Sequence, residues 1–208
     1  MNQMTSTLRL CTLSAAVMAA FALGVDDAQA HRDHGGPLHQ DQSCETWLDG
    51  RPERNVPPRC RALASQLNQV RRATSAFFSF DVAVAAGWDA FISPCVESPM
   101  GGMGYHLANI EQLGNGIVSL LRPEVLLYAP TEDGSMEFLG VEYIVPAPLW
   151  ASSEPPEIMG QSFHFNPGQN IWALHVWIGK PNPAGVFADW NPEVSCEFAP
   201  PPAPPSAD

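Results

Sequence analysis

The first thirty residues have the pattern of a secretory signal, which leaves the rest of the chain to form the folded protein. Arg9 precedes an apolar run over residues 10–25, and residues 28–30 form a small-x-small cleavage site. The run is shorter than the roughly 20 apolar residues that span a bilayer, and no later stretch approaches that length. We therefore expect a signal peptide over residues 1–30, a periplasmic or secreted protein that begins at His31, and no membrane contact after cleavage.

The charge balance of the mature chain limits its partners. The whole chain has a formal net charge of −12, and removing one Arg and two Asp with the signal leaves −11 on 178 residues. An acidic surface without a Lys/Arg cluster repels nucleic acid and anionic lipid. We expect a small molecule or a metal ion as the partner, and no nucleic acid.

Four cysteines remain after cleavage, an even number that predicts two disulfides in an exported protein. Three pairings are open. We favour Cys44–Cys60, which would attach the N-terminal segment to the start of a helix, and Cys95–Cys196, which would tie the end of the domain to its middle. The alternative, a zinc site made of cysteines, lacks the usual Cys-x-x-Cys spacing.

Periodicity divides the mature chain into three parts. Residues 31–58 are polar and aperiodic and are expected to be an extended leader, and residues 197–208 a disordered, proline-rich tail. Residues 59–196 are expected to form a single domain, which opens with a long amphipathic helix ended by Gly87, with a break near Ser79 as an alternative. The apolar stripe of this helix consists of Leu63, Leu67, Val70, Thr74, Phe77, Phe80 and Val84.

β-Branched and aromatic runs predict strands over residues 125–128, 138–145 and 171–178. Asp133-Gly134 between the first two runs is a hairpin signal. Residues 94–104 are predicted to be a glycine-rich loop, which lacks the Gly-Lys-Ser/Thr ending of a phosphate loop. The predicted fold class is therefore α+β, with an N-terminal helix packed on a mainly antiparallel sheet that could close into a small barrel or half-barrel.

Two of the predicted strands each contain one polar residue on an otherwise apolar face. Glu142 lies in a strand with two apolar faces, where an isolated carboxylate is unfavourable unless it is paired, metal-bound or protonated. His175 is likewise the one polar residue on an apolar face of its own predicted strand. Strict alternation places Phe138, Gly140 and Ile144 on the face of Glu142, and Leu139, Val141, Tyr143 and Val145 on the opposite face.

These residues predict a metal site. We expect His106 and His175 as ligands and Glu142 as third ligand or as a catalytic acid/base, with Glu124 or His164 in reserve. Imidazoles and carboxylates suit Zn, Fe, Mn or Cu, so the cofactor would be a divalent transition metal and an enzyme would use it to activate water or oxygen. The alternative is a non-catalytic structural or interaction module in which a Glu–His pair holds the core together and His164 is a surface residue.

The leader offers a second group of metal-binding side chains. A free N-terminal His31 with His34 and His39 brings three imidazoles and an amine together, a set that chelates Cu(II). The alternative is a flexible leader that binds metal adventitiously.

Several sequence blocks occur in a familiar order. They are Gly102-Met-Gly-Tyr-His106, Leu121-Arg-Pro-Glu-Val-Leu-Leu-Tyr128, Gly140-Val-Glu-Tyr143, Ala173-Leu-His-Val-Trp177 and Trp190-Asn-Pro-Glu-Val-Ser-Cys196. Together they resemble a group of small exported bacterial proteins of unassigned function. The resemblance covers residues 73–196 and leaves out the histidine-bearing leader, and it implies no particular activity.

Overall fold

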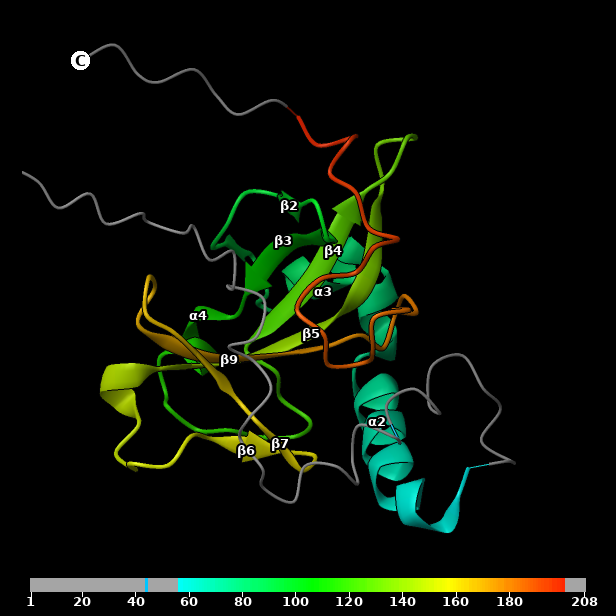
Figure 1. Ribbon diagram of the computed structural model, residues 1–208. Helices are drawn as coiled ribbons and strands as arrows, with labels where there is room; N and C mark the ends of the chain where they lie inside the picture. The colour runs from blue at the N-terminus through cyan, green and yellow to red at the C-terminus, as the bar shows by residue number, and fades with distance from the viewer. Residues whose placement is uncertain (1–43, 45–55, 201–208) are drawn as a thin grey trace, which may run out of the picture. The chain divides into compact units, whose positions relative to one another are not determined.

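The computed structural model describes Cys44 and residues 56–200 (Figure 1). The expected signal peptide, His31 and nearly all of the leader lie outside the described residues, as does the tail beyond residue 200. Within the described part of the chain, no helix is long and apolar enough to cross a membrane.

The amphipathic segment forms two helices instead of one. After the 3₁₀ turn η3 (Pro58–Cys60), α2 spans Arg61–Ala73, η4 spans Ser75–Phe78 and α3 spans Phe80–Ala85. Ser79 has extended backbone angles, so the break that we considered near this residue is confirmed. The break also rotates α3, which leaves the stripe residue Val84 partly exposed and buries Ala83 in its place.

The helices pack on a seven-stranded antiparallel sheet with the order β1-β3-β4-β5-β9-β8, in which β2 also pairs with β3. Its two ends are not joined by any ladder between described residues, so the α+β class is confirmed and a closed barrel is wrong. A separate hairpin is formed by β6 and β7. The strands are β1 (Ala90–Phe91), β2 (Val96–Ser98), β3 (Gly101–Ala108), β4 (Val125–Pro130), β5 (Met136–Pro146), β6 (Glu157–Ile158), β7 (Gln161–Ser162), β8 (His164–Asn166) and β9 (Ile171–Val176). The short elements α4 (Ile110–Leu113) and η5 (Ala147–Leu149) connect them.

The glycine-rich segment is not the loop that we expected. Much of it forms β2 and the first half of β3, which pair with each other, and the second half of β3 pairs with β4 in the interior of the sheet. Gly104 has a φ of +78°, and a Cβ at this position would lie 2.3 Å from the Tyr128 carbonyl oxygen. Glycine is required here because the backbone of β4 approaches closely, so its presence marks a sheet contact and not a flexible loop.

A β-bulge in β5 changes which side chains share a face. Leu127 pairs with Gly140 and Tyr128 with Phe138, which leaves Leu139 without a partner on β4. The Leu139 carbonyl accepts hydrogen bonds from the backbone N–H groups of residues 179 and 180. As a result, Phe138 packs with Val141 and Leu139 with Ile144, so our alternation is wrong before the bulge and correct after it.

Both faces of the sheet are covered, as the two apolar faces of β5 predicted. The first face packs against the helices through Leu67 and Val70, which contact the core around Val141 and Tyr143. The second face carries Ile144 in a smaller apolar cluster. This cluster is completed by side chains from β4 and from the segment after β9, including Leu127, Trp177 and Val194.

Both expected disulfides are present. Cys44 bonds to Cys60 at the start of α2, and Cys95 bonds to Cys196, 101 positions further along the chain. The second bond fastens the C-terminal segment beside β2.

Candidate metal centre

Strands β3, β5 and β9 place His106, Glu142 and His175 on the second face of the sheet. Glu142 in β5 and His175 in β9 are direct cross-strand partners, so their side chains leave the sheet on the same side. His106 lies on β3, two strands from β5, and its imidazole reaches across β4. All three residues are less than 9% exposed.

The distances among the three side chains fit a shared ion better than direct hydrogen bonds. His106 Nε2 lies 3.5 Å from His175 Nε2 and 3.6 Å from Glu142 Oε2, and His175 Nε2 lies 3.5 Å from Glu142 Oε1. Good hydrogen bonds between such atoms measure about 2.7–3.2 Å. Tetrahedral bonds of about 2.0–2.2 Å to one ion hold neighbouring ligand atoms about 3.3–3.6 Å apart.

Two buried atoms of the group, Glu142 Oε2 and His175 Nδ1, have no hydrogen-bond partner among the described residues. His175 Nδ1 still lies at ion-pair distance from Asp189, whereas Glu142 Oε2 has only the two imidazoles beside it. A buried carboxylate oxygen without a donor is unfavourable, and a cation is its natural partner. Across the described ranges, His106, Glu142 and His175 form the one group of three such side chains whose potential ligand atoms lie within 4.8 Å of each other. The group could therefore hold a metal ion.

Burial and charge act differently on the two imidazoles. Burial, partly opposed by Glu142, lowers the pKa of His106, which keeps this ring neutral and able to bind a metal. Burial also opposes the charged form of His175, but the carboxylates of Glu142 and Asp189 outweigh it and raise the pKa of His175. A metal ion at this site would have to displace the proton from His175.

Two residues that the sequence analysis missed support the outer nitrogens of the rings. Ser93 Oγ lies 2.8 Å from His106 Nδ1, and Asp189 Oδ1 lies 3.4 Å from His175 Nδ1. Such partners fix the ring orientation of metal-binding histidines and leave the other nitrogen for the ion. Neither residue has a periodicity signal, because both lie in irregular segments. The sequence offered one indication of Asp189: it lies in a long irregular turn that follows the predicted buried strand containing His175.

The segment that carries Asp189 is held against the sheet by several hydrogen bonds. Trp177 Nε1 donates to the Ala188 carbonyl at 2.6 Å, and the backbones of Asn191 and Gly102 exchange two hydrogen bonds. The carboxylate of Asp189 also lies 3.8 Å from the exposed His164. The two histidines hold the pKa of Asp189 well below its usual range, so that it remains charged beside His175.

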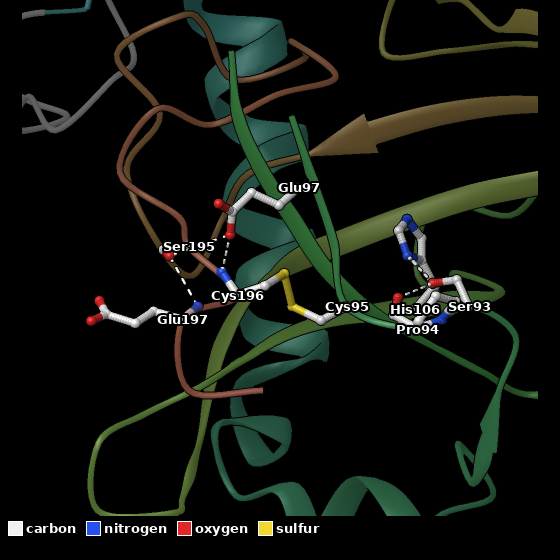
Figure 2. The surroundings of a disulfide bond; sticks show 8 residues. All are labelled: Ser93, Pro94, Cys95, Glu97, His106, Ser195, Cys196 and Glu197. Atoms are coloured by element: carbon white, nitrogen blue, oxygen red, sulfur yellow. Dashed lines mark hydrogen bonds between the residues drawn. A yellow bond between two sulfur atoms is a disulfide. The ribbon is translucent and has the colours of Figure 1, made fainter. Parts of the chain in front are cut away.

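The disulfide Cys95–Cys196 connects the two supporting segments (Figure 2). Cys95 follows Ser93 by two positions, and Cys196 ends the segment that begins near Asp189. Beside the disulfide, Glu97 accepts hydrogen bonds from the backbone N–H of Cys196 and the hydroxyl of Ser195. This covalent link therefore restrains the partners of both imidazoles.

The two reserve candidates are not members of the group. The strand register places Val125, and not Glu124, opposite Glu142. Glu124 Oε2 instead accepts a hydrogen bond from the Ile144 N–H at 3.1 Å, and burial raises the pKa of Glu124 to about 7. His164 lies on the edge strand β8, where Asp189 raises its pKa.

The group lies at a cavity of about 630 Å³ on the second face of the sheet. His106, Glu142 and His175 contribute to its wall together with Asp189, and apolar side chains contribute most of the remainder. Small-molecule sites have volumes of about 300–1,000 Å³. A metal ion in this group would thus be accessible to a small ligand.

The chain matches no protein-family model, and no curated protein or solved structure is significantly similar to it. The resemblance to small exported bacterial proteins remains a prediction from the sequence blocks. The function is therefore inferred from the geometry of the site.

Proposed function

We propose that the protein is an exported metal-binding protein in which His106, His175 and Glu142 hold one divalent transition-metal ion. The observation that carries this proposal is the triangle of ligand atoms at 3.5–3.6 Å, with the buried Glu142 Oε2 lacking any other partner in the described chain. Two imidazoles and one carboxylate suit Zn²⁺ or Fe²⁺, and also accept Mn²⁺ or Cu²⁺.

The composition of this set supports a site with ligand chemistry, and not a purely structural ion. Structural zinc sites use four protein ligands, whereas sites with three ligands leave a position for water or another molecule. Here that position would face the cavity. When bound, the metal would supply Lewis acidity toward a molecule in the cavity.

The surrounding residues have separate roles in this proposal. Ser93 and Asp189 would orient the two imidazoles through their Nδ1 atoms, and Glu142 would neutralise part of the charge of the ion. The two disulfides fit the oxidising compartment that the signal sequence predicts.

Metal analysis of the full mature protein tests the proposal. The chain should bind one equivalent of Zn²⁺ after removal of metal with EDTA, as measured by calorimetry and elemental analysis. His175→Ala and Glu142→Gln should each weaken binding at least 100-fold. Circular dichroism and disulfide content would confirm that each variant is folded.

The leader histidines require their own control, because they offer a competing chelate. A variant with His31→Ala, His34→Ala and His39→Ala should still bind one equivalent of Zn²⁺ tightly. Loss of binding in this variant with full retention in His175→Ala would assign the metal to the leader and overturn the proposal. If neither the wild-type protein nor any variant binds metal tightly, the proposal is wrong and the Glu–His group is a structural part of the core.

A further inference from the structure

The walls of the cavity differ in chemistry from its metal-binding end. Away from the metal-binding group, the lining is mainly apolar and includes Ile92, Val96, Met103, Ile144 and Ile171. These side chains come from β2, β3, β5 and β9 and from the loop before β2. The cavity therefore has one polar end and an extended apolar wall.

Charge excludes several classes of ligand. None of the described residues that line the cavity is Lys or Arg, whereas Glu142 and Asp189 both carry carboxylates. Outside the proposed metal ligands, His164 is the one lining residue of the described chain that can carry a positive charge, and the carboxylate of Asp189 lies 3.8 Å from it. A phosphate-rich or otherwise polyanionic ligand would therefore find no unpaired side-chain cation to replace its hydration. Apart from the centre itself, the site offers nothing that would favour more than one anionic group.

The side chain of Asn166, one of the polar residues that line the cavity, is already hydrogen-bonded within its own turn. Asn166 Oδ1 accepts from the N–H groups of Gly168 and Gln169, and Asn166 Nδ2 donates to Gln169 Oε1 at 3.2 Å. A ligand rich in hydroxyl groups would therefore have to compete with these hydrogen bonds for Asn166. In contrast, Ile92 and Phe165 line the cavity with 40% and 45% of their surfaces exposed. Apolar surface gathered at a concave site is typical of a ligand-binding region.

We infer that the cavity binds a small, largely apolar molecule that carries one metal-coordinating group at one end. This inference rests on the proposed metal centre, which would receive the coordinating group while the apolar body lies along Ile144 and Ile171. It adds the class of ligand, which the metal centre alone does not specify.

A series of straight-chain hydroxamates tests the inference, because the head group binds zinc and the tail length varies. Affinities for the full mature protein loaded with Zn²⁺ would be measured by calorimetry from acetohydroxamate to octanohydroxamate. Each methylene that enters the cavity should tighten binding about threefold to fourfold. The increase should stop when the tail reaches solvent.

Two variants test whether the hydroxamate tail lies in this cavity. Ala173 lines it on the same face of β9 as His175, so Ala173→Leu should weaken octanohydroxamate at least 10-fold and acetohydroxamate far less. Ile171→Ala, which removes wall contacts without adding bulk, should reduce the gain per methylene. Ala151→Leu adds the same side chain at an exposed position and should leave the series unchanged.

The outcomes separate the two proposals. Failure of the wild-type protein to bind zinc would overturn the metal centre, whatever the hydroxamates do. Zinc binding with affinities that do not depend on tail length would overturn the apolar ligand class and leave the metal centre intact. A dependence on tail length that Ala173→Leu and Ile171→Ala leave unchanged would place the tail elsewhere and overturn the inference as well.

Discussion

Replacing Glu124 with Gln should make the protein more stable at neutral pH and should abolish one part of its pH dependence. Glu124 is 2% exposed, and its Oε2 accepts a hydrogen bond from the backbone N–H of Ile144. Burial raises its pKa from 4.5 to about 7. The folded protein therefore holds a proton on this side chain over a pH range in which the unfolded chain has released it.

The direction and size of the effect follow from linkage. Because the folded state binds the proton more tightly, the stabilisation from protonated Glu124 is complete below pH 4.5 and is lost as the pH rises to about 7. At about 1.4 kcal/mol per pKa unit, the loss amounts to about 3 kcal/mol. In Glu124→Gln the amide oxygen can still accept from Ile144, and the side chain stays neutral at every pH.

Urea unfolding at a series of pH values from 4 to 8, with EDTA present, measures this difference. The free energy of unfolding of Glu124→Gln minus that of the wild type should rise by about 3 kcal/mol between pH 4 and pH 8. Glu111→Gln, on the exposed side of α4, should change the free energy by less than about 0.5 kcal/mol throughout. A difference for Glu124→Gln that stays constant with pH would refute the buried-carboxyl argument.

Three further substitutions and one mass measurement test other parts of the protein. Joint replacement of Cys95 and Cys196 by Ala should lower the free energy of unfolding about 1.5 kcal/mol more than removal of the other disulfide. The reason is that the Cys95–Cys196 loop spans 101 residues instead of 16. Equal melting temperatures of the two variants would contradict this. Asp189→Asn should weaken zinc binding about 10- to 100-fold in a chelator competition, and an unchanged affinity would exclude a positioning role. Gly140→Ala should destabilise the protein by about 1–3 kcal/mol in urea, because the new Cβ would lie 2.3 Å from a β9 carbonyl oxygen; an unaltered midpoint would argue against the bulge geometry. The intact mass after export should correspond to a chain that begins at His31 and lacks four hydrogens, and a retained signal would contradict the expected compartment.

Much of the architecture could be predicted from local patterns. The stripe that begins at Leu63 predicted the helix that covers the first face, and the runs around Asp133-Gly134 predicted the β4–β5 hairpin. The apolar residues on both faces of their strands predicted that Glu142 and His175 are buried. These predictions succeed because side-chain periodicity records which face of one element is buried.

The site itself depended on contacts that no local pattern records. Whether Glu124 or Val125 faces Glu142 depends on strand register, and the bulge at Leu139 reverses the alternation that the sequence suggests. His106 could be chosen as a polar residue after a glycine-rich segment, but its place in an interior strand could not.

The sequence by itself thus determined the class of fold, the even set of disulfide-forming cysteines and the buried polar residues of two strands. Tertiary structure decided which of those residues meet, and it added Ser93 and Asp189 from irregular segments to support the two imidazoles. The physical reason is that burial is read from neighbours along the chain, whereas a ligand set with spacings of 3.5–3.6 Å is created by strand pairing and loop closure between distant segments.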